Sequence, residues 1–445
     1  MSNSNTTELG KTSRDSWGSK WGFILACIGS AVGMGNIWLF PYRVGQFGGA
    51  AYIIAYIACV CLIGFTGIIE EVAFGRAAGG GPIAAFGFAF EKKGHRKLGE
   101  ALGLIPTIGS LGIAIGYSVV VGWILRYLVS AVTGAAMRYT PADFGALASH
   151  FGSVPWHIIG LAIVFAVMTA GISKGIEKLN RVMMPLFFLL FIILAIRALF
   201  LPGAGDGYKY LLMPQWGALA DPRTWVFALG QAFFSLSLGG SGTVVYGSYL
   251  SKQEDVISAA RNVAFFDTIA ALLAALVVIP SVFALIGADA VGSGPPLMFI
   301  TMVEVFKNMP GGRIFMIIFF VAVTFAALTS LVNLFESAIE ALQNKLKFSR
   351  AKSVLIIAVI AVAVGVCIEG IVGEWMDVVS IYINPLGAII AAFLFFLVLG
   401  SAFAQEQIQL GHAKQVGGWI KPMGIFFCIA TIAVFILGVF FGGIG

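Results

Sequence analysis

The stretch GSAVGMGNIWLFPY, residues 29–42, decides how the rest of the sequence is interpreted. It lies inside an apolar run that is long enough to cross a lipid bilayer, yet it contains three glycines, a serine, an asparagine and a proline. Backbone that leaves the helix at membrane depth is tolerated only where protein or a water-filled cavity satisfies its polar groups. The stretch therefore predicts either a binding site lined by free carbonyl and amide groups or a seam of small residues where helices pack.

Composition places the whole chain in a membrane. Of its 445 residues, 59% are apolar and 11% are charged, whereas soluble proteins are about a quarter charged. The apolar runs predict eleven membrane spans, at residues 22–44, 50–76, 101–132, 155–172, 177–200, 223–250, 256–287, 312–345, 353–370, 375–400 and 421–443. The five cysteines all lie in apolar runs and are expected to be core residues rather than disulfides or metal ligands.

Basic residues are unevenly distributed between the predicted loops. If the N-terminal segment, residues 1–21, lies in the cytoplasm, the segments on its side hold 19 of the 27 Lys and Arg residues and the other side holds eight. The positive-inside rule therefore predicts a cytoplasmic N-terminus and a multi-pass protein of the cell (plasma) membrane. The net charge of +6 is no sign of nucleic-acid binding, because the basic residues lie in short loops.

A second interrupted span follows the first by about five spans. The segment GQAFFSLSLGGSGTVVYGSYL, residues 230–250, again places a glycine cluster between apolar stretches. Broken helices at corresponding places in two five-span halves indicate an inverted-repeat transporter with its site at mid-membrane. The predicted fold is an all-α polytopic membrane protein, with one repeat at residues 22–200, an inverted repeat at 223–400 and an eleventh span at 421–443.

At these residues the sequence resembles the neurotransmitter:sodium symporter family, which shares the LeuT fold. The resemblance rests on the two interrupted segments, on Tyr117 and Trp123 spaced six apart, and on AALTS at 326–330. In layout the chain is similar to an eleven-span bacterial member that transports hydrophobic amino acids. The resemblance implies sodium-coupled symport of aliphatic and aromatic L-amino acids, such as leucine or tryptophan, by alternating access.

Two sodium sites are implied by the resemblance, both made of oxygen ligands that suit a hard cation. The first would use Ala31, Asn36, Ser235 and Asp267 together with the substrate carboxylate, and Asp267 stands where the family usually has asparagine. The second would use the carbonyl groups of Gly29, Val32 and Ala326 and the hydroxyl groups of Thr329 and Ser330. Taken alone, Thr329 and Ser330 would more often be hydroxyls that bond their own helix.

The resemblance also places the amino-acid substrate between the two breaks. Its carboxylate would meet the amides near Gly33 and Gly35 and the Tyr117 hydroxyl. Its amine would meet carbonyls at Ala31 and around Phe234 and Ser237. The positions implied for substrate binding are Ala31, Val32, Gly33, Gly35, Ile113, Tyr117, Phe234, Ser235, Ser237, Gly240, Asn333 and Leu334. We expect Gly240, which often carries a bulky side chain in the family, to leave room for an aromatic substrate.

The gates implied by the resemblance are incomplete. Leu39 stands where the family has an arginine, so Arg43 and Asp377 are the expected outer pair. Arg14 and Trp17 are present for an inner gate, but Asn344 stands at the matched acidic position.

Other intramembrane signals lie in spans 2, 5 and 8. In the family, the spacing of Gly175 and Pro185 in span 5 marks a cytoplasmic helix end that can unwind. Glu71 and Glu336 are intramembrane carboxylates, and such residues are functional candidates by default. We favour a scaffold role for both, in which they accept hydrogen bonds from interrupted helices.

Three other interpretations compete with this one. An intramembrane hydrolase acting through Ser241 is unsupported, because all four histidines lie in loops or near span ends. A proton-coupled carrier is kept open by Asp267, and an amino-acid sensor of the same fold by the lack of any sequence signal for transport itself. The chain is expected to be no enzyme and to use two Na⁺ ions. No chloride is expected, because the Asp267 carboxylate would supply the negative charge near the ions.

Overall fold

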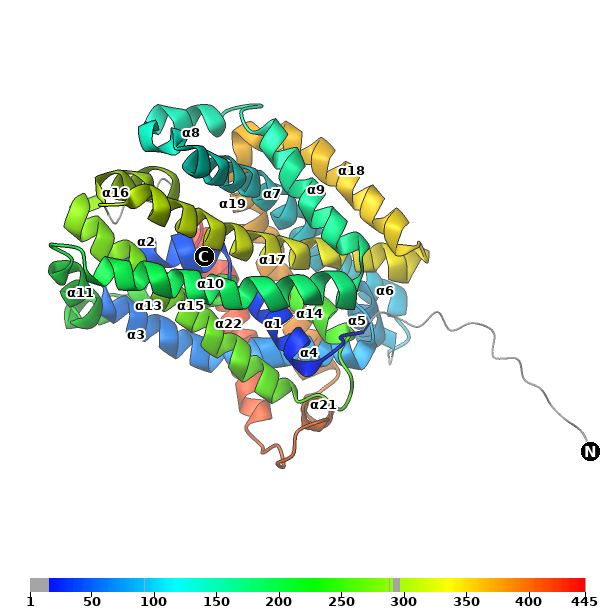
Figure 1. The fold of residues 1–445 in the computed structure, drawn as a ribbon. Coiled ribbons are helices and arrows are strands. Elements are labelled where there is room, and N and C mark those ends of the chain that lie inside the picture. Colours follow the sequence, from blue (N-terminus) through cyan, green and yellow to red (C-terminus); the bar gives the residue numbers. More distant parts are fainter. Residues whose placement is uncertain (1–15, 92, 288, 291–296, 445) are drawn as a thin grey trace, which may run out of the picture.

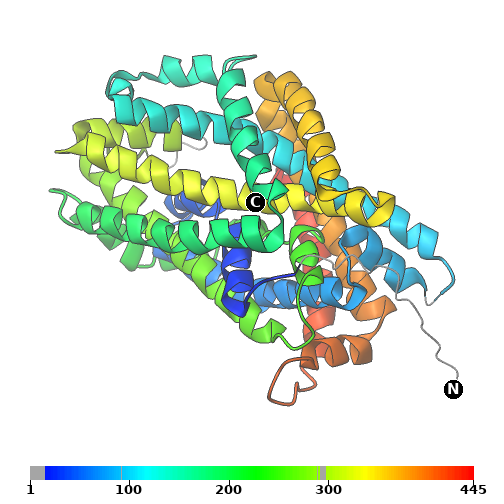
Figure 2. The same ribbon diagram turned by 45° about the vertical axis from the view of Figure 1, so that its right-hand side comes forward.

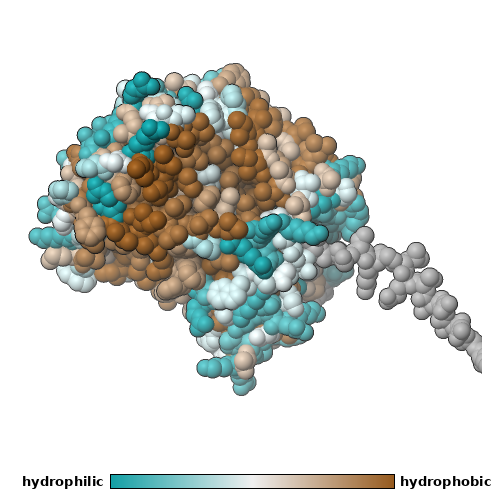
Figure 3. Space-filling model, in the orientation of Figure 1, coloured by the Kyte–Doolittle hydropathy of each residue, from teal (hydrophilic) through white to brown (hydrophobic). Residues whose placement is uncertain are grey.

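The computed structural model describes residues 16–91, 93–287, 289–290 and 297–444, and these ranges contain helices and no β-strand (Figure 1). Seven helices are long and apolar enough to span a membrane, or eight if the bent pair Lys20–Ala31 and Gly35–Gln46 is one span. The space-filling view shows a broad apolar face across the long helices, with hydrophilic residues gathered at its two ends (Figure 3). The molecule is therefore a multi-pass membrane protein.

Interrupted helices are frequent in the first half of the chain. Its helical segments are α1 (Lys20–Ala31), η1 (Gly35–Leu39), α2 (Phe40–Gln46), α3 (Ala50–Cys59), η2 (Val60–Gly64), α4 (Phe65–Ala78), α5 (Pro82–Glu91), α6 (Arg96–Leu102), α7 (Leu104–Thr133), η3 (Ala135–Arg138), α8 (Pro141–Leu147), α9 (Val154–Thr169), η4 (Ile172–Glu177) and α10 (Lys178–Leu199).

The second half of the chain also contains several interrupted helices. Its segments are α11 (Gly205–Leu212), α12 (Trp216–Leu219), α13 (Pro222–Ser235), α14 (Gly242–Ser248), α15 (Val256–Leu285), η6 (Leu297–Thr301), α16 (Met302–Asn308), α17 (Gly312–Leu346), α18 (Arg350–Ile368), η7 (Glu369–Ile371), α19 (Val372–Val378), η8 (Val379–Ile383), α20 (Asn384–Phe393), η9 (Leu394–Val398), α21 (Ser401–Gln409) and α22 (Ile420–Phe441).

Helices lie at all eleven predicted spans, although length and apolarity alone distinguish fewer. The expected fourth span is α9, a helix of 16 residues, and the ninth and tenth spans share the continuous helical stretch Arg350–Val398. The sixth span is divided into α13 and α14, each too short to cross a bilayer alone.

The first broken helix lies at the centre of the bundle. α1 packs against α10, α15 and α17, while α7 and α17 form the most extensive helix pair. Figures 1 and 2 show the long helices α10 and α17 running side by side across the molecule, with α1 next to α10. The two interruptions are thereby enclosed by unbroken helices, which keep lipid away from the free backbone groups.

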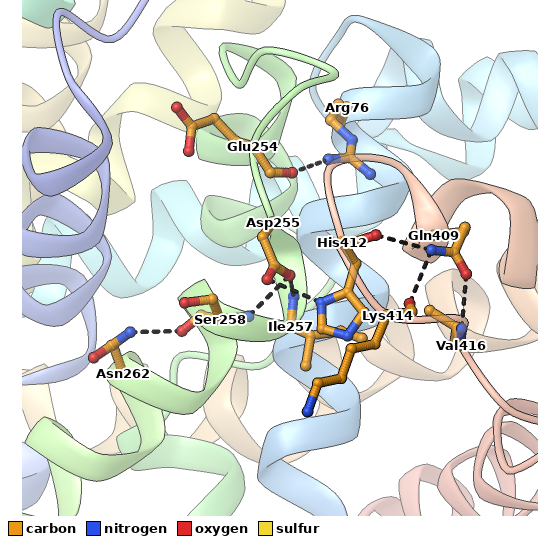
Figure 4. Close-up of polar contacts among 10 residues, drawn as sticks. All are labelled: Arg76, Glu254, Asp255, Ile257, Ser258, Asn262, Gln409, His412, Lys414 and Val416. Carbon is orange, nitrogen blue, oxygen red and sulfur yellow. Dashed lines mark hydrogen bonds and ion pairs between the residues drawn. The ribbon is translucent and has the colours of Figure 1, made fainter.

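The segment between spans 10 and 11 is fastened to the bundle by a polar network (Figure 4). Arg76, near the end of α4, donates hydrogen bonds to the carbonyl oxygens of Glu254 and Gln407. His412 Nδ1 lies 2.9 Å from a carboxylate oxygen of Asp255, and Asp255 caps the N-terminus of α15. The network joins span 2, the start of span 7 and the loop before span 11.

Candidate functional site

The first interruption separates α1 from η1, and the two parts of the span are bent by 51°. α1 ends at Ala31 because Val32 adopts an extended conformation. Two amides freed by the break find side-chain partners: Gly33 N–H donates to Asn36 Oδ1 at 2.9 Å, and Met34 N–H donates to the Tyr117 hydroxyl at 3.3 Å. The break is therefore held open by specific side chains.

The second interruption runs from the end of α13 to the start of α14. The amides of Gly239 and Gly240 both donate to one oxygen of Glu71, at 2.9 and 2.8 Å. This is the scaffold role expected for Glu71. Ser237 adopts a left-handed conformation with φ of 55°, which is a strained conformation for a residue with a side chain. Its hydroxyl donates to the Ser30 carbonyl at 3.0 Å, so the two breaks contact each other.

Glu336 is bonded in a different way than expected, because its partners in the described residues are side chains and not amides of an interrupted helix. It accepts hydrogen bonds from the Arg350 guanidinium, at 2.9 and 2.8 Å, and from the Tyr249 hydroxyl at 3.0 Å. Its partners therefore join α17 to α18 and to the segment that follows α14.

Three side chains expected at the first sodium site lie close together, but Asn36 turns its amide nitrogen toward Ser235 and Asp267, because its oxygen accepts from the Gly33 amide. Ser235 Oγ donates to the Asp267 carboxylate at 2.9 Å, and Asn36 Nδ2 donates to Asp267 Oδ1 at 2.8 Å. Asn36, Ser235 and Asp267 are all fully buried. Tyr56, which sequence reasoning missed, donates its hydroxyl to the other Asp267 oxygen at 2.9 Å. The arrangement is a buried carboxylate surrounded by hydroxyl and amide groups from spans 1, 2, 6 and 7.

At the second expected sodium site, the side chain of Ser330 lies against the end of α1. Its hydroxyl lies 3.2 Å from the carbonyl oxygen of Gly29 and 3.1 Å from that of Val32. The Thr329 hydroxyl bonds the carbonyls of Phe325 and Ala326 in its own helix, at 3.0 and 3.1 Å. Carbonyl and hydroxyl oxygens of span 1 and span 8 therefore converge here.

A cavity lies between the two breaks, and ten of the twelve expected substrate positions line it: Ala31, Gly33, Gly35, Ile113, Tyr117, Phe234, Ser235, Ser237, Asn333 and Leu334. The cavity is also lined by residues that were not expected to bind substrate, which are Ser30, Met34, Ser241, Gly242, Ser330, Met376 and Asn384. Of these, Ser330 was expected at the second sodium site. The residues from the breaks had a sequence signal, because they lie inside the interrupted segments. Met376 and Asn384 had none, because only packing brings span 10 to the cavity.

Val32 and Gly240 do not line the cavity. Gly240 has φ of +69°, and a Cβ atom built on it would lie 2.6 Å from the carbonyl oxygen of Gly387 in α20. The expectation that Gly240 opens the pocket wall therefore finds no support in this geometry, because its missing side chain would point into α20. Gly242 does line the cavity, and a Cβ atom there would lie 2.1 Å from Asn333 Oδ1.

The expected outer gate is not formed in this structure. Arg43 donates to Gln46 at 3.0 Å and lies over the ring of Phe227, 4.2 Å from its centroid. Within the described ranges no ion pair joins Arg43 to Asp377.

At the opposite end, Arg14 lies outside the described residues. Trp17 donates its indole N–H to the Tyr246 carbonyl at 3.1 Å and packs edge-on against the Tyr246 ring. Trp17 thus covers this end of the second broken helix. Asn344 donates to Glu340 at 2.9 Å.

The start of span 5 is joined to the segment before α1. Glu177 accepts hydrogen bonds from the Gly18 amide at 2.6 Å and from the Ser19 hydroxyl at 3.1 Å, and it pairs with Arg181 at 2.6 Å. A Cβ atom on Gly175 would lie 2.2 Å from the Val167 carbonyl oxygen, so this glycine is needed for close packing on α9. Pro185 lies inside α10.

Within the residues that the structure describes, Ser241, the alternative nucleophile, has no histidine partner. His157 lies 2.8 Å from the Ser118 hydroxyl, and His412 pairs with Asp255. Ser241 lines the cavity between the breaks instead.

Two interrupted helices that meet across a buried cavity, within a bundle of membrane-length helices, define a multi-pass transporter of the LeuT fold. The model of the Sodium:neurotransmitter symporter family matches residues 14–141 and 142–443. The chain belongs to this family, whose members are sodium-dependent transporters and not enzymes.

Relatives from several organisms agree with this assignment. The chain is 38% identical to the uncharacterized sodium-dependent transporter YhdH of Bacillus subtilis, over 72% of this chain and 70% of YhdH. It is 32% identical to the uncharacterized sodium-dependent transporter MJ1319 of Methanocaldococcus jannaschii, over 95% of this chain and 90% of that protein. It is 28% identical to the human sodium-dependent neutral amino acid transporter SLC6A17, over 64% of this chain but only 42% of the human protein.

A solved structure is similar over nearly the whole length. The crystal structure of MhsT in complex with L-phenylalanine superposes with a TM-score of 0.84 at 32% sequence identity, covering 96% of this chain and 99% of MhsT.

Proposed function

We propose that the protein is a Na⁺-coupled symporter that imports hydrophobic L-amino acids, both aliphatic and aromatic, by alternating access. The observation that carries this proposal is the position of Ser235. Its side chain bonds the Asp267 carboxylate, and the same residue lines the cavity between the breaks. A cation held by Ser235 and Asp267, and by Asn36 once its amide turns its oxygen toward the ion, would therefore lie beside the bound amino acid, whose carboxylate could complete its coordination.

The cavity wall supports an amino-acid substrate with an apolar side chain. Ile113, Phe234, Leu334 and Met376 supply apolar surface. The Tyr117 hydroxyl can donate to a substrate carboxylate, and the amides of Gly33 and Met34, which bond Asn36 and Tyr117 in this structure, would turn to the carboxylate by exchanging these partners. MhsT was solved with L-phenylalanine, and SLC6A17 is named as a neutral amino acid transporter.

Two Na⁺ ions fit the chemistry of the two oxygen sets. The first set contains a buried carboxylate, and the second offers carbonyl and hydroxyl oxygens without a charged group at Gly29, Val32 and Ser330. Hard cations prefer oxygen ligands of this kind. We further propose that the protein lies in the plasma membrane with its N-terminus in the cytoplasm, so that Trp17 covers the cytoplasmic side. Transport is expected to be independent of chloride.

Uptake into proteoliposomes tests the function directly. Labelled leucine should accumulate when an inward Na⁺ gradient is imposed, and it should not accumulate when choline replaces Na⁺ at the same pH. Substrate affinity should also be higher in Na⁺ than in choline, because each bound ligand favours the other when they share contacts. Equal affinity in the two salts would contradict the mechanism.

One observation favours a second candidate, a proton-coupled carrier. Asp267 is a fully buried carboxylate beside the cavity, and such a group can carry a proton in place of a metal ion. Accumulation that follows a pH gradient and persists in choline would identify this candidate. Binding without any accumulation would identify a sensor of the same fold.

A further inference from the structure

Asn180 is a polar residue of span 5 that belongs neither to the cavity nor to the gates. It lies in the first turn of α10 and is fully buried. Its Nδ2 atom donates to the Ile176 carbonyl at 2.8 Å, whereas its Oδ1 atom has no hydrogen-bond partner in the described part of the chain. A buried acceptor without a partner is unfavourable, and a bound cation is one group that would satisfy it.

The orientation of this amide is determined by its own contacts. If the side chain were flipped, Oδ1 would face the Ile176 carbonyl oxygen and two acceptors would oppose each other. The hydrogen bond from Nδ2 to Ile176 therefore directs Oδ1 away from α10 and toward α1.

The free oxygen lies against the second oxygen set. A Cβ atom built on Gly29 would lie 1.9 Å from Asn180 Oδ1 and 3.0 Å from Thr329 Cβ. The Gly29 carbonyl is one of the groups that contact the Ser330 hydroxyl. Asn180 of span 5, Gly29 of span 1 and Thr329 of span 8 therefore meet at one place. Only glycine at position 29 permits this approach.

We propose that Asn180 supplies an oxygen ligand to the second Na⁺ site from span 5. This inference rests on the proposed function, because it requires that site to bind Na⁺. An amide oxygen is neutral, so it adds coordination without adding charge, as suits a monovalent cation surrounded by carbonyl and hydroxyl oxygens. The ion would thereby be in contact with the end of span 5 that also carries Glu177, and its departure would remove one of the contacts between span 5 and span 1.

Na⁺ binding to the purified full chain, without substrate, tests the proposal. The thermal unfolding midpoint is followed as NaCl replaces choline chloride at constant ionic strength, since a ligand that binds the folded state raises this midpoint. Asn180→Leu removes the oxygen at similar volume, and its half-maximal Na⁺ concentration should rise about tenfold. Asn180→Asp keeps an oxygen and should respond at wild-type Na⁺ concentrations or lower.

Asn262 provides a matched control. Its Nδ2 atom donates to the Ser258 carbonyl at 2.7 Å, one helical turn back, as Asn180 does, but it lies in α15 near the network of Figure 4. Asn262→Leu should leave the Na⁺ response unchanged. If Asn180→Leu does not fold, Asn180→Ala takes its place with the same expectation.

The outcomes separate the two proposals. The role of Asn180 would be overturned if both the leucine and the alanine variant kept the wild-type half-maximal Na⁺ concentration. It would also be overturned if Asn180→Asp raised this concentration as much as Asn180→Leu does. Neither result would contradict the proposed sodium coupling. A wild-type protein that shows no Na⁺ response at all would overturn the proposed sodium coupling as well.

Discussion

Two glycines, only two residues apart, have different tasks in the second broken helix. Gly240 has a positive φ and faces the Gly387 carbonyl, whereas Gly242 lies on the cavity wall against Asn333. A glycine at positive φ is needed for the backbone, because a side chain there costs about 1–2 kcal/mol. A glycine on the wall is needed for space. The two substitutions therefore have different expected effects.

Gly242→Ala should narrow the cavity and penalise large substrates. Overpacking a filled site costs typically about 1–3 kcal/mol, so tryptophan should lose affinity relative to leucine. Gly240→Ala should lower the thermal stability and leave the ratio of tryptophan to leucine affinity unchanged. Competition of labelled leucine uptake by unlabelled tryptophan measures both effects. In the wild-type protein tryptophan should compete; a change of the ratio in Gly240→Ala would contradict this assignment.

Asp267 is the residue expected to replace chloride. Its carboxylate is buried and accepts hydrogen bonds from Asn36, Ser235 and Tyr56. Wild-type uptake should be the same in chloride and in gluconate. Asp267→Asn removes the fixed charge and should reduce uptake in gluconate, with partial recovery when chloride is supplied. Normal uptake by Asp267→Asn in gluconate would show that this charge is dispensable.

At the scale of elements, Glu177 joins the start of span 5 to the segment that leads into span 1. Glu177 is 2% exposed and holds the Gly18 amide, the Ser19 hydroxyl and Arg181 at once. Hydrogen bonds to a charged group contribute about 1.5–3 kcal/mol each, less for Arg181 because it is half exposed. The junction should therefore hold this end of the two spans together.

Glu177→Gln should weaken the junction and expose α1. Cys27 is buried in α1 at 4% exposure, so in a chain without the other cysteines its reaction with a polar maleimide should speed up. Substrate affinity should fall at the same time, because the open form is favoured. Lys178→Gln, an exposed neighbour on α10, serves as the control. If Cys27 reacts equally fast in both variants, the junction does not limit access.

The hinge expected in span 5 is better tested at Pro185 than at Gly175. Alanine at position 175 would collide with the Val167 carbonyl, so it would disturb packing as well as helix preference. Pro185→Ala adds about 3 kcal/mol of helix preference and should favour the intact helix. Substrate binding should be retained while the uptake rate falls. An unchanged uptake rate would remove Pro185 from the mechanism.

At the scale of the whole molecule, the Asp255–His412 pair fastens the last loop to the bundle. Burial raises the pKa of Asp255, but the hydrogen bonds from His412 and from the amides of Ser258 and Ile257 outweigh burial, so the pKa lies below the ordinary 3.8. A carboxyl whose pKa is lowered by folding stabilises the folded state above its unfolded pKa. This contribution is lost as the pH falls through the folded pKa.

Asp255→Asn should therefore lower the thermal stability at neutral pH and matter little at a pH below the lowered pKa of the folded state. Asparagine is as good an N-cap as aspartate, so the loss reports the pairing with His412. Asp255→Ala should lose the helix cap in addition, about 1 kcal/mol. Thermal unfolding of the three proteins at both pH values measures this. An equal difference between wild type and Asp255→Asn at both pH values would contradict the linkage.

The sequence alone determined where the backbone is interrupted and which residues lie at the interruptions. The interruption at Gly33 could be predicted because glycine and polar residues weaken a helix inside lipid unless protein or a cavity surrounds them. Asn36 and Ser235 were placed at the site by the resemblance to the family. The family motifs then assigned the expected ligand positions to particular spans. These are local properties, since helix formation and membrane insertion depend on residues close in the sequence.

Only the tertiary structure decided which distant side chains complete the site. Tyr56, Met376 and Asn384 carry no sequence signal of their own, and only packing brings them to the site. The direction of the missing side chain at Gly240 depends on the approach of α20, and the free oxygen of Asn180 depends on how closely α10 meets Gly29. Such contacts arise when helices far apart in the sequence pack together, so they are determined by the whole bundle rather than by any one segment.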